Sequence, residues 1–323
     1  MILEIKVLLF SFIITILLSF LIIPILKKLK VGQIEREEGP KSHLKKEGTP
    51  TMGGIIFLIA TVIVAVIVVL LYNKEKNINN LIPLLLVTIG FGVVGFIDDF
   101  KKLILKDTKG LKPAYKMLGL LIISVAFILY LTNIAKIGTE VYIPFLKFYI
   151  KFPILLYIPF AIFVMLGTTN AVNLTDGVDG LSTSVCTIII TCLTVIGILI
   201  NIPEISIFGS IVIGACLGFL LFNLYPAKVI MGDTGSLLLG GVIVSMALYL
   251  KLPLLLIIIA LVPVIETLSV IIQVFYFKKT GNRIFKMSPI HHHFELSGWS
   301  ENKVVCIFSI ATLMFCIIGI LAI

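Results

Sequence analysis

The stretch that decides the fold is residues 81–102, which read LIPLLLVTIGFGVVGFIDDFKK. An α-helix needs about 20 apolar residues to cross the roughly 30 Å hydrocarbon core of a bilayer. This run is uncharged until its end, where Asp98 and Asp99 are followed by Lys101 and Lys102. Adjacent carboxylates at a membrane border are costly unless they bind a metal or another cation. They indicate a functional group more strongly than a merely solvated helix end, which stays the alternative.

The same pattern extends over the whole chain of 323 residues, of which 59% are hydrophobic and 13% charged. Ordinary soluble domains are roughly 45–50% apolar and about 25% charged. This composition excludes a soluble globular enzyme, a disordered chain and a nucleic-acid-binding protein. It predicts an all-α polytopic membrane protein with residues 1–323 in one integral-membrane domain. About ten apolar blocks qualify as transmembrane helices: 3–26, 51–72, 81–100, 115–133, 152–169, 181–200, 205–222, 234–250, 252–277 and 303–323.

The positive charges orient these predicted helices. The odd-numbered connections and their flanks hold 19 of the 26 Lys and Arg residues. Because cytoplasmic loops carry the excess of positive charge, these connections are predicted to be cytoplasmic and both termini to lie outside. All six aspartates also fall on that cytoplasmic side. A functional site on the cytoplasmic face is therefore expected.

Ionisable residues inside the apolar blocks are rare. Only Glu266, close to Pro263, lies well within one. It either hydrogen-bonds backbone groups freed by the proline or has a functional role, and the sequence leaves both open. A proton- or metal-coupled transporter would need ionisable groups in several spans. The distribution favours an enzyme at the membrane surface.

Residues 170–182, NAVNLTDGVDGLS, follow the fifth predicted span. Asn170, Asn173, Asp176 and Asp179 recur at every third position, which on a tight helical turn places them along one side. The alternative is a turn in which an aspartate caps the next helix. A cap does not require four polar groups on one side, so a binding function is favoured.

Residues 222–236, FNLYPAKVIMGDTGS, precede the eighth predicted span. A helix that opens with Gly-Asp-Thr-Gly-Ser can direct free backbone N–H groups at a phosphate. Asp233 either caps this helix or binds Mg²⁺, which prefers few carboxylates together with phosphate oxygens.

Two further polar segments are candidates for anion contact. Residues 287–295, MSPIHHHFE, carry three consecutive histidines. Consecutive helical side chains point about 100° apart, so His291, His292 and His293 are poorly placed to bind one metal together and better suited to anion or substrate contact. Residues 45–54, KKEGTPTMGG, place Lys46 before a Gly- and Thr-rich helix start that is typical of a phosphate site.

Taken in order, these motifs closely resemble those of the phospho-N-acetylmuramoyl-pentapeptide-transferases, a family in the polyprenyl-phosphate N-acetylhexosamine-1-phosphate transferase superfamily. The aspartate motifs are shared across the superfamily, whereas GTPTMGG and HHHFE are similar to this family in particular. The motifs that carry the resemblance are GTPTMGG at 48–54, DDFKK at 98–102, NLTDGVDGL at 173–181, FNLYPAKVIMGDTGS at 222–236 and MSPIHHHFE at 287–295.

The resemblance implies that the chain moves phospho-MurNAc-pentapeptide from UDP-MurNAc-pentapeptide to undecaprenyl phosphate. The products are lipid I and UMP, and the reaction is the first membrane step of peptidoglycan synthesis. It further implies a Mg²⁺ cofactor, a multi-pass position in the bacterial cytoplasmic (inner) membrane and a homodimer. A GlcNAc-1-phosphate transferase of the same superfamily is the alternative within this class.

The expected site residues follow from the motifs and the resemblance together. Catalytic roles are expected for Asp98, Asp99, Asp233 and His291, with Asp233 as the Mg²⁺ ligand. Substrate contacts are expected for Lys46, Thr51, Lys102, Lys116, Asn173, Asp176, Asp179, Asn223, Gln273, His292 and His293.

Two points remain open at this stage. Asp98 deprotonates the lipid phosphate for direct attack, which is favoured because a phosphate oxyanion is already nucleophilic, or an aspartate forms a phospho-enzyme. The chain also departs from the family pattern at Ile230, where a Phe that stacks on uracil is expected. Stacking is worth about 1–3 kcal/mol per base, so weaker uridine binding or the use of another ring such as Phe222 is expected.

Overall fold

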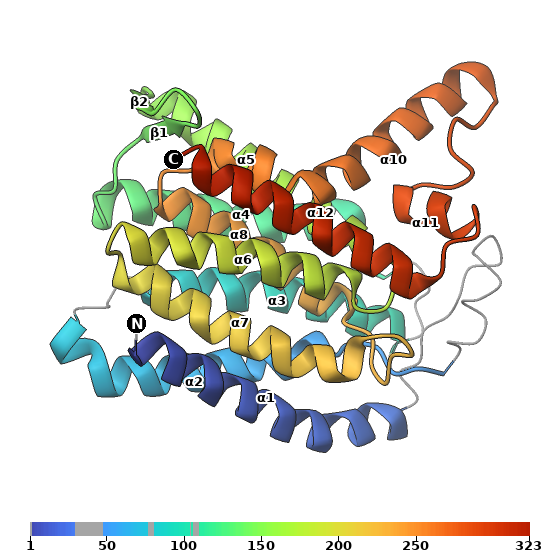
Figure 1. The fold of residues 1–323 in the computed structure, drawn as a ribbon, viewed down its shortest axis with the longest axis horizontal. Coiled ribbons are helices and arrows are strands. Elements are labelled where there is room, and N and C mark those ends of the chain that lie inside the picture. The colour runs from blue at the N-terminus through green and yellow to red at the C-terminus, as the bar shows by residue number, and fades with distance from the viewer. Residues whose placement is uncertain (1, 30–47, 77–80, 104, 106–109) are drawn as a thin grey trace.

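The computed structural model describes residues 2–29, 48–76, 81–103, 105 and 110–323. Long helices dominate it, and a two-stranded antiparallel hairpin joins α4 and its extension to α5 (Figure 1). The elements are α1 (Ile2–Lys28), α2 (Gly54–Lys76), α3 (Leu81–Leu103), α4 (Pro113–Leu129), the π-helical extension η2 (Tyr130–Ile134), β1 (Glu140–Ile143), β2 (Phe148–Lys151), α5 (Ile154–Thr175), α6 (Leu181–Leu199), α7 (Pro203–Asn223), α8 (Gly232–Tyr249), the 3₁₀ turn η3 (Pro253–Leu255), α9 (Leu256–Ile259), α10 (Leu261–Thr280), α11 (Ile290–Glu295) and α12 (Glu301–Leu321).

Ten helices in the described part of the chain are long and apolar enough to cross a membrane, as the sequence predicts. Burial ranks them. Within the apolar window of α8, 89% of residues are buried, compared with 22% for α1. The central helix α8 is therefore enclosed by protein, while α1 turns most of its surface outward, as expected of a helix that faces lipid.

The ninth predicted span is wrong in one respect. Residues 252–277 do not form one helix, because the chain makes the turn η3 and the short α9, and then breaks at Ala260 before α10 begins. Pro263 lies in the first turn of α10, where a backbone N–H would have no intrahelical acceptor, so its absence in proline costs no helical hydrogen bond. After this break, α10 takes a different direction from the other long helices and projects from the bundle (Figure 1). The short helix α11 lies between α10 and α12.

The two termini lie at the same end of the bundle as the hairpin, and the C-terminus lies beside it (Figure 1). The hairpin contacts the C-terminus directly, since the Tyr142 hydroxyl donates to the Ile323 carbonyl at 2.8 Å and the Phe145 N–H donates to the Ala322 carbonyl at 2.9 Å. At this end Lys251 also forms a 2.6 Å ion pair with Glu140. Ten spans return the chain to the side on which it began, so this placement agrees with the predicted number.

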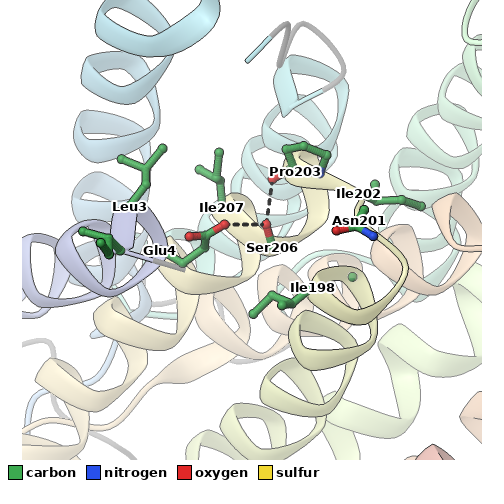
Figure 2. Close-up of a pocket in the computed structure, with 10 residues that line it drawn as sticks. Leu3, Glu4, Ile198, Asn201, Ile202, Pro203, Ser206 and Ile207 are labelled. Carbon is green, nitrogen blue, oxygen red and sulfur yellow. Dashed lines mark hydrogen bonds between the residues drawn. The ribbon is translucent and has the colours of Figure 1, made fainter. Parts of the chain in front are cut away.

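The terminal end also holds a cavity of about 640 Å³ between α1 and the turn that joins α6 to α7. Figure 2 shows the Glu4 carboxylate directed at Ser206, whose Oγ lies 3.1 Å from Glu4 Oε1 and 3.1 Å from the Pro203 carbonyl oxygen. Ser206 lies in the first turn of α7, whereas Asn223 and the motif that follows it lie at the other end of that helix. The cavity is thus remote from the predicted site.

Candidate active site

The structure brings the two adjacent aspartates to the N-terminus of the central helix α8, but gives them different partners. Asp99, 5% exposed, accepts three hydrogen bonds there: from the Asp233 N–H at 3.1 Å, the Thr234 N–H at 2.9 Å and the Thr234 hydroxyl at 2.6 Å. The first N–H groups of a helix have no intrahelical acceptor, and no side chain of the segment before α8 caps it. Asp99 of α3 therefore caps α8 from another helix.

Asp98 faces two lysines and the aspartate of α8. Lys102 Nζ lies 2.8 Å from Asp98 Oδ2 and 2.8 Å from Asp233 Oδ2. Lys116 Nζ lies 3.4 Å from Asp98 Oδ2 and 3.1 Å from Asp233 Oδ2. The Leu111 N–H donates to the other oxygen of Asp98 at 2.7 Å. Two ammonium groups thus bridge two carboxylates, and we call Asp98, Lys102, Lys116 and Asp233 the charged cluster.

Asn173 joins the charged cluster from α5. Its amide Nδ2 donates to Asp233 Oδ1 at 2.8 Å and lies 2.8 Å from the Ser236 hydroxyl. Both oxygens of Asp233 are consequently engaged, one by the lysines and one by Asn173. Four sequence-distant segments, from α3, α4, α5 and α8, meet at this point.

Two other predicted contacts serve the chain itself. Asp179 Oδ2 accepts from the Ala227 N–H at 3.0 Å. Asn223 donates to the Val229 carbonyl at 3.0 Å and accepts from the Thr183 hydroxyl at 2.8 Å. Both side chains are buried, and both hold the segment 224–231 that leads into α8. The predicted substrate contacts of Asp179 and Asn223, and of the half-buried Asp176, stay predictions. The N-cap position of α6 is held by Gly180 and not by an aspartate.

The GTPTMGG segment packs against the entrance to α8. The N–H groups of Gly53 and Gly54 donate to the carbonyls of Ile230 and Met231, both at 2.9 Å, and the Ile230 N–H donates to the Pro50 carbonyl at 2.8 Å. A Cβ atom at Gly54 would collide with the backbone of Gly235, so only glycine permits this approach. Buried Thr51 lies beside the same turn. Lys46 lies outside the described residues, and its role stays a prediction.

Gln273 of α10 supports a loop. Its Oε1 accepts from the N–H groups of Ile284 and Phe285 at 3.1 and 3.0 Å, and its Nε2 donates to the Phe285 carbonyl at 3.1 Å. The side chain is buried, yet it also lines a cavity of about 320 Å³ at the end of α10, together with Lys278 and Arg283. The substrate contact that the resemblance implies for Gln273 stays a prediction.

The three histidines of α11 point to three different places, as their sequence spacing predicts. Nδ1 of His291 lies 3.1 Å from Glu266 Oε2, Nδ1 of His292 lies 2.8 Å from Glu295 Oε2, and Nδ1 of His293 accepts from the Lys286 N–H at 3.2 Å. The His291 ring is fully buried.

The two carboxylates of the charged cluster are also suited to a divalent cation, in addition to the two lysines that they contact. No group of three or more His, Cys, Asp or Glu side chains converges within the described residues. Mg²⁺, however, is commonly held by one or two carboxylates and completes its six positions with water and substrate phosphates. The carboxylates of Asp98 and Asp233 supply that number, and the two ammonium groups between them mark where positive charge is stabilised.

Two residues of this region did not stand out individually in the sequence. Thr234 and Ser236 contact Asp99 and Asn173, and their signal was their place one and three residues after Asp233. Glu266 stands out in the sequence as an acid inside an apolar block, but no sequence pattern indicates its contact with His291, which lies 25 residues later.

Comparisons with known proteins agree with the motifs. The model of glycosyl transferase family 4 matches residues 81–251, and signature 1 of the phospho-N-acetylmuramoyl-pentapeptide-transferases matches residues 46–58. A phospho-N-acetylmuramoyl-pentapeptide-transferase of Clostridium perfringens (strain 13 / Type A) is 52% identical over 309 residues, which cover 96% of this chain and 95% of the relative. One of Clostridium beijerinckii is 50% identical over 316 residues, 98% of this chain and 95% of the relative. One of Clostridium novyi is 48% identical over 312 residues, 97% of this chain and 94% of the relative.

Proposed function

The chain belongs to the phospho-N-acetylmuramoyl-pentapeptide-transferase family, and from this premise we propose that it transfers phospho-MurNAc-pentapeptide from UDP-MurNAc-pentapeptide to undecaprenyl phosphate, forming lipid I and UMP. The observation that carries the proposal is the charged cluster, in which two lysines and two aspartates from three helices meet at the N-terminus of α8. The reaction exchanges one pyrophosphate linkage for another, so its site must stabilise phosphate charge during the exchange.

The two aspartates of α3 have different proposed roles. Asp98 is the catalytic residue that accepts the proton of the lipid phosphate, because its carboxylate lies among the ammonium groups to which a phosphate is attracted. Asp99 is a positioning residue, because its oxygens are committed to Asp233 and Thr234. This assignment favours direct attack by the lipid phosphate on the β-phosphorus of the donor. The oxyanion forms the new P–O bond, and UMP leaves with the electrons of the broken one.

A charge count supports a Mg²⁺ requirement. Asp98 and Asp233 carry two negative charges, and Lys102 and Lys116 carry two positive ones, so the cluster is neutral before substrates bind. The donor diphosphate and the lipid phosphate then add several negative charges. Mg²⁺ bound to Asp233, with Asp98 close by, would supply Lewis-acid stabilisation of phosphate oxygens. Lys102 and Lys116 hold the phosphates as point charges, and Asn173 keeps Asp233 in place.

The orientation of the protein completes the proposal. The excess of positive charge at the end that holds the charged cluster supports a cytoplasmic position for that end, with both termini outside, in the cytoplasmic membrane of a bacterium. UDP-linked sugars are water-soluble and reach this face, while undecaprenyl phosphate presents its head group there from the lipid. Assembly as a homodimer is part of the same proposal and rests on the sequence resemblance.

The test is a choice between donors. Purified protein receives undecaprenyl phosphate, Mg²⁺ and either UDP-MurNAc-pentapeptide or UDP-GlcNAc, and the lipid product is identified by mass. We expect lipid I from the first donor and no lipid product from the second. A GlcNAc-linked lipid from the second donor alone would instead place the chain with the GlcNAc-1-phosphate transferases of the superfamily.

A further inference from the structure

Glu266 and His291 form a buried pair between two helices. Glu266 lies in α10 and His291 in α11, and neither side chain is exposed. Glu266 Oε2 lies 3.1 Å from His291 Nδ1 and 3.5 Å from the His291 backbone nitrogen. A buried carboxylate requires a compensating donor, and among the described residues the two nitrogen atoms beside Glu266 Oε2 both belong to His291. The two residues are therefore coupled.

The proline nearby does not account for Glu266. In the described residues, no hydrogen bond joins the Glu266 side chain to the backbone around Pro263. The Pro263 carbonyl accepts from the Thr267 hydroxyl at 3.0 Å instead. The sequence left two roles open for Glu266. Hydrogen bonding to backbone groups freed by Pro263 is without support, whereas the contact with His291 supports a functional role.

The opposite edge of the His291 ring packs on the loop between α5 and α6. A Cβ atom at Gly177 would collide with His291 Nε2, so the ring occupies the space that a side chain would fill. Gly177 directly follows Asp176 in the NLTDGVDGL motif. In the described structure both ring nitrogens are buried without a hydrogen-bond partner, and Nδ1 lies within ion-pair distance of Glu266 Oε2, at 3.1 Å. One nitrogen of the ring therefore lies beside the Glu266 carboxylate, and the other lies against the NLTDGVDGL motif.

We propose that Glu266 is the positioning residue of His291. During the reaction, Nδ1–H donates a hydrogen bond to the Glu266 carboxylate, 3.1 Å away, which fixes the orientation and tautomer of the ring, so Nε2 is the atom that acts beside the Asp176–Gly177 turn. A carboxylate that holds one imidazole nitrogen so that the other can work is a recurring arrangement in catalysis. This inference rests on the proposed function, because it assigns the use of His291 to that reaction.

The test compares Glu266→Gln with a matched control, Ser269→Ala. Ser269 is buried in the same helix, and its hydroxyl donates to the Glu266 carbonyl at 2.7 Å. We expect kcat for lipid I formation to fall at least about tenfold in Glu266→Gln, while KM for the donor changes less than about threefold. Ser269→Ala should keep both constants near wild type. A wild-type kcat in Glu266→Gln, or an equal loss in both variants, would overturn the proposal.

A double-mutant cycle separates positioning from general stability. In a His291→Asn background, Glu266→Gln should lower kcat no further, because the ring that it positions is gone. Losses that multiply would contradict the proposal. If Glu266→Gln cannot be purified, Gly177→Ala is measured in its place. Its added methyl group should displace the His291 ring and lower kcat, and full activity of this variant would overturn the inference.

Melting temperatures keep this proposal separate from the proposed function. They are measured for the four proteins of the double-mutant cycle: wild type, Glu266→Gln, His291→Asn and the double variant. If wild-type protein makes no lipid I, the proposed function fails, and the melting temperatures alone report whether Glu266 holds His291. Non-additive shifts are expected for residues in contact, and additive shifts would overturn the pairing.

Discussion

Asp99→Ala should destabilise the protein, whereas Asp98→Ala should mainly inactivate it. The first substitution removes the one side-chain acceptor that the described residues offer to the Asp233 and Thr234 N–H groups, at the start of α8, the most buried of the described spans. Each buried donor left without a partner costs about 1–3 kcal/mol, so two of them amount to roughly 2–6 kcal/mol. The Thr234 hydroxyl can rotate and is left out of this sum.

Asp98→Ala leaves fewer buried groups without a partner. Lys102 and Lys116 keep their contacts with Asp233, and the Lys102 side chain is 39% exposed and can be hydrated. Only the Leu111 N–H loses its acceptor at a partly buried position. We expect the loss of stability to be at most about 1–2 kcal/mol, together with a severe loss of activity.

The melting temperature can be followed with a thiol-reactive dye in detergent. Four of the five cysteines are buried and become reactive on unfolding, while Cys306 is exposed and sets the baseline. Domains of 150–250 residues lose about 2–4 °C per kcal/mol, so Asp99→Ala should melt about 5 °C or more below wild type. Equal melting temperatures for the two variants, with both inactive, would refute the capping role and return Asp99 to the chemistry.

Three further outcomes are expected. Asp233→Asn should lower lipid I formation by about 100-fold or more at every Mg²⁺ concentration while the protein still purifies, since the amide keeps size but not charge; near-normal activity at low Mg²⁺ would place the ligand elsewhere. Ile230→Phe should tighten UMP binding up to about tenfold in calorimetry with kcat unchanged, because the added ring can stack on uracil while Pro50 and Gly53 hold the backbone of Ile230, whose side chain is half-buried. Weaker binding with a lower melting temperature would show that the side chain serves packing. In intact cells, a membrane-impermeant thiol reagent should label Leu146→Cys and spare Asn282→Cys, both exposed sites; the reverse pattern would invert the proposed orientation.

The sequence predicted the ten spans because uncharged runs of about 20 residues leave few alternatives to a membrane helix. It missed the break at Ala260, since apolar residues continue through it and only the prolines at 253 and 263 hinted at a change. A hydropathy pattern records that a segment is apolar, but the enclosing helices decide whether that segment stays straight.

The sequence named all four side chains of the charged cluster as candidate site residues, but it did not separate their roles. Asp98 and Asp99 are adjacent, yet one faces lysines and the other caps a helix that begins 133 residues later. That difference depends on which face of α3 meets α8. The same limit applies to Gln273, whose amide supports a loop, and to Glu266, whose partner lies on another helix.

The most direct measurement is the release of UMP by purified protein given UDP-MurNAc-pentapeptide and Mg²⁺, with and without undecaprenyl phosphate. Direct attack by the lipid phosphate at the charged cluster requires that UMP appear only when the acceptor is present, one UMP for each lipid I, and that Asp98→Asn abolish both. A stoichiometric burst of UMP without acceptor would show a phospho-enzyme and contradict direct transfer, and no UMP under either condition would contradict the function itself.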